Sequence, residues 1–527
     1  MRHRYLLLVV LAAAVAGCAL ERAGLRHDDG GGEGADAFMP PRDFGPRDGF
    51  VPPPDLGPVD AFVPPADLGP PDLGTADAFV PPLDLGSPDL GPVDAFVPPP
   101  DLGPPDLGPV DAFVLPADLG PPPCGSGATR CASAAALETC TGAVWTPTTC
   151  ALGCSATGTA HCLVMIPSNV DAALFVDGGN VVVAGSATWN TGSCAVGSLP
   201  GLPTRVTQAG GGDVCVVRVH DLNISGQVSV QGPIPLVILA QGEIVISGTL
   251  DVSAYGTTEG PGGGLGSNFT RFASGPSAGD DGGNTATYTD SGGGGGGFCG
   301  AGGNGGDAGG TLAGGPGGAV LVTNLSPLIG GSGGGTGGAG ESTGLGGAGG
   351  GAVQLSALVR VQVGGRIYAG GGGGGGGLDG TTRDWNIGAG GGGGSGGSIL
   401  IESPVVDLSG TLRGSGGGGG GAASCRGYGV AGNGTDGAAV SGAPSGGVRG
   451  GLCAGGAFGG VGGAGGADAT LGGTNGDSNG ASGGNGAGGG GAAGCIVVRT
   501  PTGALPAGGV RSPSVAPGLQ GLLLHTL

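Results

Sequence analysis

The stretch Asn223–Val230, NISGQVSV, returns 22 residues later as VISGTLDV at Val245–Val252. Two further copies of the pattern occupy 362–369 and 407–414. Alternation with a period of two places Ile246, Leu250 and Val252 on one face of a strand. The Gly at a fixed point in each copy supplies a tight bend. The pattern therefore predicts short strands that turn a corner at glycine.

A second alternating strand precedes three of these copies, with aliphatic pairs at Val237/Leu239, Val353/Leu355 and Ile399/Ile401. A single unit of this kind cannot bury its apolar face, whereas stacked units bury a continuous core. We therefore expect an all-β fold, a right-handed parallel β-helix or solenoid, over 163–500. The coils resemble those of the pectin-lyase-like β-helix superfamily.

Glycine-rich excursions interrupt the strands at 256–318, 330–351, 370–397 and 414–494. The chain holds 137 Gly among its 527 residues, without the three-residue period of collagen. Because polyglycine has no side chains to bury, the excursions either stay mobile or pack as extended layers held by Cα–H···O contacts. They resemble the loops of glycine-rich bacterial surface proteins.

The N-terminus has the organisation of an export signal. Arg2 and Arg4 precede an apolar run from Leu6 to Ala16, which is too short to span a bilayer but suits a signal sequence. It ends in Val15-Ala16-Gly17-Cys18, which resembles the lipobox of bacterial lipoproteins. The resemblance implies that 1–17 is removed and that Cys18 is lipidated. Ala19, where Asp would favour retention, implies an outer-membrane lipoprotein exposed at the cell surface; the alternative is an ordinary signal peptide.

Residues 18–123 form an acidic, proline-rich repeat with a 17-residue period, as in DAFVPPLDLGSPDLGPV at 77–93. Frequent Pro prevents helices and central strands, and mutual repulsion of the Asp side chains extends the chain. We expect a disordered stalk. Its Pro-Pro motifs act either as a spacer or as ligands of aromatic-lined grooves.

Six cysteines within 124–162 predict a small disulfide module, because so short an exported segment cannot build a sufficient core. They are Cys124, Cys131, Cys140, Cys150, Cys154 and Cys162. Zinc binding is the alternative. The module resembles Cys-rich modules that follow the stalks of myxobacteria-like surface lipoproteins. Six further disulfide candidates follow, of which the first two suit one local loop: Cys194, Cys215, Cys299, Cys425, Cys453 and Cys495.

Side chains suited to catalysis are scarce outside the stalk. The net charge of −21 argues against nucleic acid as a partner. An enzyme on this fold would be a polysaccharide lyase or hydrolase with clustered carboxylates and Arg. Asp251, Tyr368 and Arg413 occupy equivalent outward positions, and stacking would align them in one ladder. The alternative is a solvated polar face, and we expect no enzyme.

Two Gly/Asn/Asp stretches, at 302–307 and 432–437, resemble the calcium-binding nonapeptide of secreted repeat proteins. They offer Asp307 and Asp436 as ligands, although Gly309 stands where that motif needs an apolar residue. Calcium is the one cofactor that the sequence raises. We therefore expect a lipid-anchored structural or adhesive surface protein. Its expected partners are extracellular glycans or neighbouring surface proteins, and 501–527 is expected to be a loose tail or cap.

Overall fold

The structure is a computed structural model that describes residues 124–284, 289–338, 342–378, 388–423, 431–438, 440–450, 458–478 and 484–527. The signal sequence, Cys18 and the stalk lie outside the described residues, as do Cys425 and Cys453. Within the described ranges no helix is both long and apolar enough to cross a membrane. Among the described residues, the one helical element is the short 3₁₀ helix η1 (Ala172–Leu174).

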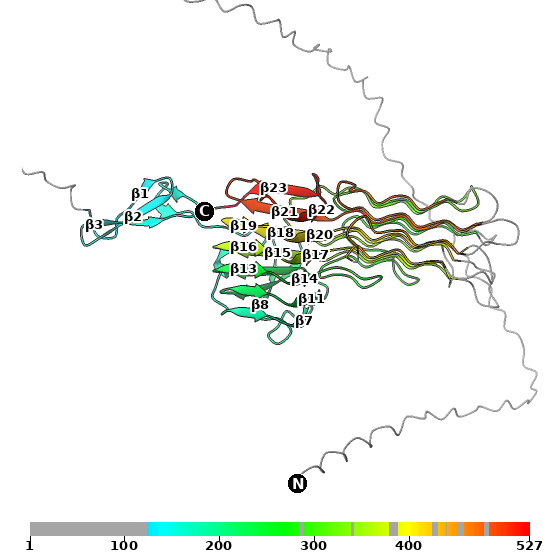
Figure 1. Cartoon of the computed structure of the whole chain (residues 1–527), viewed down its shortest axis with the longest axis horizontal. Helices are drawn as coiled ribbons and strands as arrows, with labels where there is room; N and C mark the ends of the chain where they lie inside the picture. Colours follow the sequence, from blue (N-terminus) through cyan, green and yellow to red (C-terminus); the bar gives the residue numbers. More distant parts are fainter. Residues whose placement is uncertain are drawn as a thin grey trace, which may run out of the picture. The chain divides into compact units, whose positions relative to one another are not determined.

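Three sheets of mainly parallel strands make up the body of the molecule (Figure 1). Sheet 1 contains β6 (Val181–Val183), β10 (Leu222–Ile224), β13 (Glu243–Ile246), β16 (Arg360–Val363) and β19 (Val405–Asp407). Sheet 2 contains β7 (Ser186–Asn190), β11 (Gln227–Gln231), β14 (Thr249–Asp251), β17 (Arg366–Tyr368), β20 (Thr411–Arg413) and β22 (Val510–Ser512). Sheet 3 contains β8 (Leu202–Thr207), β9 (Asp213–Val219), β12 (Leu236–Ala240), β15 (Ala352–Ala357), β18 (Ser398–Glu402), β21 (Cys495–Thr500) and β23 (Leu519–Leu523).

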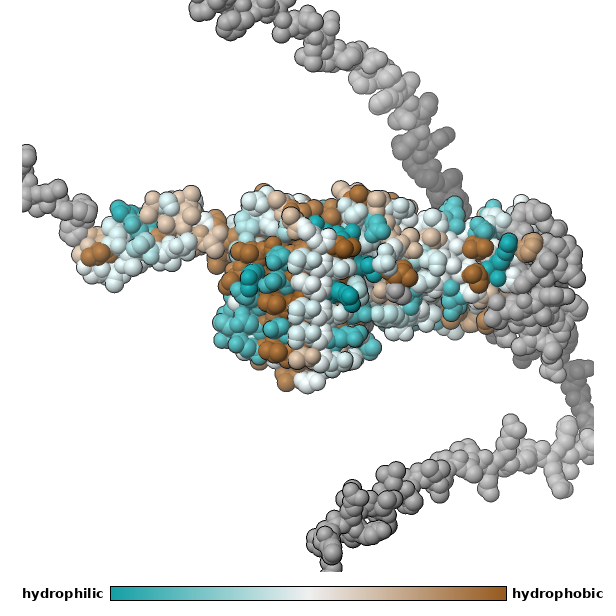
Figure 2. Space-filling view, in the orientation of Figure 1, coloured by the Kyte–Doolittle hydropathy of each residue, from teal (hydrophilic) through white to brown (hydrophobic). Residues whose placement is uncertain are grey.

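The chain visits the three sheets in the same order in each unit, so that β10, β11 and β12 are followed by β13, β14 and β15. Only β8 joins its sheet in the antiparallel sense. Equivalent residues of successive units pair directly: Val228 lies opposite Leu250, and Leu250 opposite Ile367. The repeated sequence pattern therefore becomes columns of like residues, visible as bands of similar hydropathy across the strands (Figure 2).

Inward-facing residues of all three sheets form one aliphatic core. Ile246, Leu250 and Val252 belong to it and are fully buried, as the alternation predicts. Part of the other face of sheet 3 is also apolar, and there Val237, Leu239 and Leu400 pack with Phe298. Burial on both faces explains why β12 reads as an unbroken aliphatic run.

All the long glycine-rich connections leave sheet 2 and return to sheet 3. They join β14 to β15, β17 to β18 and β20 to β21. Their extended segments lie side by side and continue away from the sheets (Figure 1). We call these segments, listed next, the glycine bundle. They are 260–267, 274–283, 291–298, 300–307, 314–321, 330–338, 343–351, 369–378, 388–397, 414–423, 431–438, 444–450, 459–467, 471–478 and 486–494.

The hydrogen bonds of the glycine bundle rotate with a period of three residues. In 291–298, Gly293 and Gly296 donate to the carbonyls of Gly390 and Gly393, whereas Gly294 donates to Asp280. Gly295 donates to Gly303, and Gly297 donates to Ser277. Successive N–H groups thus face three different neighbouring segments. Three residues per turn with all bonds made to neighbours is the geometry of packed polyproline II helices.

A second set of neighbours explains the uninterrupted glycine runs of the inner segments. A Cβ on Gly293, Gly294 or Gly295 would lie 2.3, 1.9 or 2.0 Å from a carbonyl oxygen of another segment. The hydrogen in that place instead points at the oxygen, as in a Cα–H···O contact. Of the two predicted alternatives for the excursions, packing in extended layers is therefore confirmed for the described residues.

Outer segments relax this requirement at one residue in three. In 300–307 the exposed residues are Ala301, Asn304 and Asp307, and the glycines between them are buried or half-buried. The triplet Gly-Gly-X therefore marks a helix at the surface of the bundle. Uninterrupted glycine runs such as 292–297 mark a helix in the interior of the bundle.

The predicted disulfide module consists of β1 (Thr129–Ser133), β2 (Ala136–Thr141) and β3 (Val144–Thr149) in one antiparallel sheet, with β4 (Cys154–Ser155) paired to β5 (His161–Cys162). The bonds are Cys124–Cys140, Cys131–Cys154 and Cys150–Cys162. All six cysteines are thus in disulfides, and zinc has no thiolate here. The predicted Cys194–Cys215 loop is also present, and Cys299 pairs with Cys495.

The C-terminal segment 501–527 is a cap and not a loose tail. Its strands β22 and β23 extend sheets 2 and 3 beyond β20 and β21. The final residues then run antiparallel to the start of the body, where Val164 and Leu527 exchange two backbone bonds of 3.1 and 3.0 Å. We call the paired stretches 164–169 and 523–527 the terminal strap.

Candidate functional site

The predicted ladder on sheet 2 is present. Asp251 lies opposite Tyr368, and Tyr368 opposite Arg413, on the neighbouring strands β14, β17 and β20. The guanidinium carbon of Arg413 lies 5.5 Å from the centre of the Tyr368 ring, within cation–π range. One acidic, one phenolic and one cationic side chain therefore stand in a row.

This row is not a solvated face. Only 6% of Asp251 and 9% of Arg413 is exposed, because the chain passes from these strand ends straight into the glycine bundle. The Asp251 carboxylate accepts hydrogen bonds from the Ser253 N–H at 2.9 Å and from the Tyr255 hydroxyl. Burial and this bond raise the pKa of Tyr255 well above its usual range. A substrate would have to displace Tyr255 to reach the carboxylate.

The two calcium candidates accept hydrogen bonds from the backbone of the bundle surface. Asp436 Oδ1 accepts the N–H groups of Gly256 and Gly373 at 2.8 and 2.7 Å. Asp307 Oδ1 accepts the Gly314 N–H at 3.0 Å. Outward N–H groups of a surface helix have no neighbouring segment to bind, so a side-chain oxygen at the X position satisfies them. Within the described ranges, no three His, Cys, Asp or Glu side chains gather as a metal site would require.

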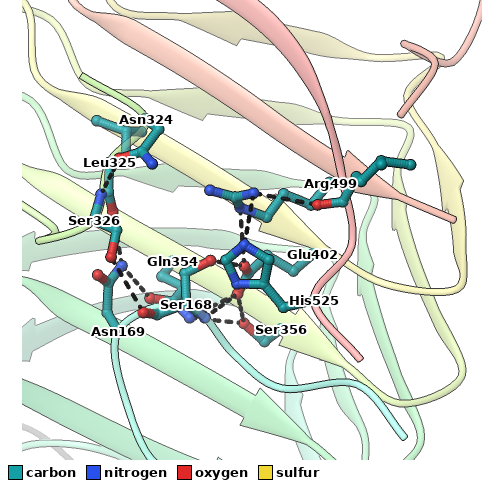
Figure 3. A network of polar contacts seen from close by, with 11 residues as sticks. Ser168, Asn169, Asn324, Leu325, Ser326, Gln354, Ser356, Glu402, Arg499 and His525 are labelled. Carbon is teal, nitrogen blue, oxygen red and sulfur yellow. Dashed lines mark hydrogen bonds and ion pairs between the residues drawn. The ribbon is translucent and has the colours of Figure 1, made fainter. Parts of the chain in front are cut away.

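A second polar cluster lies on the outer face of sheet 3, beneath the terminal strap (Figure 3). Ser356 lies opposite Glu402, and Glu402 opposite Arg499, on β15, β18 and β21. The fully buried Glu402 carboxylate accepts bonds from Ser356 Oγ at 2.8 Å and Gln354 Nε2 at 2.9 Å. From the strap, the N–H of Ser168 donates to it at 3.2 Å, and the Ser168 hydroxyl also donates.

Arg499 is the cationic partner in this cluster. Its Nε lies 3.5 Å from Glu402 Oε1 as an ion pair, and its Nη1 contacts the Leu523 carbonyl and His525 Nε2, both at 3.2 Å. Burial lowers the pKa of Arg499, and the Glu402 carboxylate opposes that change. A buried ion pair with bonds to both stretches of the strap fixes the start of the body and the C-terminal residues on the sheet. It also sets Ser168, His525 and Glu402 near one another.

The sequence-based prediction did not include this second cluster, although a signal for it was present. Ser356, Glu402 and Arg499 each follow an aliphatic residue of a sheet 3 strand: Leu355, Ile401 and Val498. Alternation would have placed all three on one face in one row. Comparison of units at equal register, as applied to sheet 2, would therefore have found it; the covering strap has no comparable signal.

No family model, no curated protein and no solved structure matches the chain.

Proposed function

We propose that this chain is a lipid-anchored protein of the bacterial outer membrane that presents a rigid body at the cell surface for structural or adhesive contacts. In this proposal Cys18 carries the lipid and the repeats of 18–123 act as the stalk. The three sheets are the faces of a right-handed parallel β-helix, since β-crossover connections are almost always right-handed.

The glycine bundle is the observation that carries the proposal. Its fifteen segments, which lie between 260 and 494, devote about 130 residues to backbone packing that leaves side chains mainly on the outside. Such a body resists deformation, because every inner segment is bonded to neighbours on all sides. Rigid presentation of surface side chains is what an adhesive or structural element requires.

The test compares intact cells carrying the wild-type gene, a deletion, and Cys18→Ser. Surface biotinylation of the wild-type protein is expected, together with loss of membrane association in Cys18→Ser. The deletion strain should lose adhesion or envelope integrity. Unchanged adhesion, motility and envelope integrity in the deletion strain would count against the proposal.

A carbohydrate-active enzyme is the second candidate, favoured by the in-register row of Asp251, Tyr368 and Arg413. Incubation of the full chain with acidic and neutral polysaccharides measures it directly. Turnover that disappears in Asp251→Asn and in Arg413→Gln, with unchanged melting temperatures, would establish this activity. No product from any glycan would dismiss it.

Calcium stabilisation is tested separately through Asp307 and Asp436. If calcium is bound, a chelator lowers the melting temperature of the wild-type chain by several degrees. The same chelator leaves Asp307→Asn/Asp436→Asn unaffected. An unaltered wild-type melting temperature would exclude this role.

A further inference from the structure

One edge of the glycine bundle contains a hollow of about 380 Å³. One side is formed by the turn 268–272, and the other by Asp281, Gly282, Thr336 and Gly337 of neighbouring segments. Hydrophobic surface also occurs on the bundle towards its end away from the sheets (Figure 2). The hollow has the size of a small-ligand pocket.

The hollow occupies the position of a missing length of polyproline II helix. Segment 260–267 runs beside 330–338, with Gly264 and Ser267 donating to Gly331 and Gly334 at 2.8 and 2.9 Å. The chain then turns back, and Ser274 donates to Leu265. The neighbours continue, since Gly282 still bonds to Thr336 and Gly337 to Gly344. The lattice is therefore open where residues after 267 would have extended it.

The turn beside this opening carries unusual side chains. Phe269 is 61% exposed and Phe272 is 82% exposed, with Arg271 between them. Reversing the chain does not require aromatic residues: the turns bridged by Ala308–Leu312 and by Ala467–Thr470 contain none. Exposed aromatic pairs of this kind mark contact surfaces.

The turn is held in place before any ligand arrives. Asn268 Oδ1 accepts bonds from the N–H of Thr270 and of Arg271 at 3.0 and 3.1 Å. The Ser267 hydroxyl donates to the Arg271 carbonyl at 3.0 Å. A fixed backbone lowers the entropic cost of binding through the two phenylalanines.

We propose that this hollow binds a polyproline II segment of the proline-rich repeat 18–123 from a second copy of the chain. An extended helix of that type lies along the hollow beside the turn, and its prolines stack on Phe269 and Phe272 as in other aromatic-lined grooves for Pro-rich segments. The repeat region carries 17 Asp and two Glu against four Arg. Its excess negative charge complements Arg271, while Asp281 on the facing side of the hollow already accepts the Thr336 N–H at 2.8 Å.

A second copy is the favoured source because every chain brings several repeats, any of which can enter the hollow of a neighbouring chain. Copies anchored in one membrane meet at a high effective concentration, so that individually weak contacts join them into a network. This inference deepens the proposed surface role, on which it rests, by naming the neighbouring surface protein as the chain itself.

Sedimentation velocity of the full chain carrying Cys18→Ser tests the proposal in solution. We expect association that grows with concentration and is reversed by excess peptide DAFVPPLDLGSPDLGPV, residues 77–93. Phe269→Ala/Phe272→Ala should weaken association and anisotropy-detected peptide binding at least tenfold, with an unchanged melting temperature. Pro81→Ala/Pro82→Ala in the peptide should abolish competition.

Phe458→Ala is the matched control, because Phe458 is 37% exposed and lies under Arg449 elsewhere on the bundle. This variant should associate like the parent chain. A parent chain that remains monomeric overturns the proposal, as does association that survives in the double phenylalanine variant. Reversal by a neutral oligosaccharide and not by the peptide would also overturn it. Because the assay is independent of cells, these failures leave the surface role to its own test.

Discussion

The sheets and the glycine bundle both stack successive units of the chain, but the sheets do so through side chains and the bundle through the backbone. Around Leu250 and Ile367, neighbouring units meet through aliphatic side chains that are fully buried. Around Gly294 they meet through backbone alone, with N–H groups bonded on one set of neighbours and Cα–H groups facing another. The bundle gains little from the hydrophobic effect and depends on complete hydrogen bonding, whereas the sheets depend on both.

This contrast implies different sensitivities to substitution. The sheet core suffers when a side chain is removed, because a cavity remains. The bundle suffers when a side chain is added, because the lattice has no space for a Cβ. Each region is therefore tested by the change that the other tolerates.

The largest expected effect is in the bundle interior. In Gly294→Val the added Cβ would lie 1.9 Å from the Pro316 carbonyl oxygen, so the segments must separate and lose several hydrogen bonds. We expect a loss of more than about 4 kcal/mol in the free energy of unfolding, measured by urea titration. Ala301→Val, at an exposed X position, is the control and should stay within about 0.5 kcal/mol. Equal effects of the two would contradict a packed lattice.

The ion pair beneath the terminal strap comes next. Glu402→Ala leaves Arg499 buried without its carboxylate, which costs about 3–5 kcal/mol. The matched pair is Glu243 with Arg360, joined at 2.8 Å but more than one-third exposed; Glu243→Ala should cost less than about 1 kcal/mol. Thermal melts of both variants measure the difference. A mild Glu402→Ala would mean that the strap is not held by this cluster.

A cavity in the sheet core should rank third. Leu250→Ala removes a fully buried side chain and should cost about 2–5 kcal/mol. Val182→Ala on β6 removes an exposed one and should be close to neutral. Urea titrations of the two variants give the values. If Leu250→Ala leaves the free energy of unfolding unchanged, Leu250 is not part of the hydrophobic core.

The smallest effect is a pH dependence that originates in the bundle. Burial raises the pKa of Asp290 from 3.8 to about 6. Because the folded state binds this proton more tightly than the unfolded chain, its contribution is complete below about pH 4. The contribution is lost as the pH rises from about 4 to about 6. In Asp290→Asn, the free energy of unfolding should therefore change less between pH 4 and 7 than in the wild type. If the pH dependence of the variant equals that of the wild type, it originates in other groups.

The sequence was sufficient to predict the strands, their stacking and the row on sheet 2, because a period of two and a fixed glycine are local signals. Alternation placed Ile246, Leu250 and Val252 correctly in the core. It also placed Asp251 in the right column but in the wrong environment. Asp251 is buried because the chain continues from its strand into the glycine bundle, and the local alternation pattern does not predict this burial.

Pairings between segments far apart in the sequence could not be predicted from these local signals. Segment 291–298 is hydrogen-bonded to 486–494, nearly two hundred residues away. Because glycine has no side chain, the sequence of one segment does not indicate which other segment it pairs with. The terminal strap likewise pairs Val164 with Leu527 across the whole body. Its buried contacts with Glu402 therefore had no counterpart in the repeat pattern.

Amide hydrogen exchange, followed by mass spectrometry on the full chain, examines the glycine bundle most directly. Peptides covering 291–298 and 486–494 should exchange as slowly as those of β12 and β18, because their N–H groups are bonded inside the lattice. Exchange of these peptides at the rate of an unstructured chain, with β12 and β18 still protected, would contradict the packed arrangement of polyglycine.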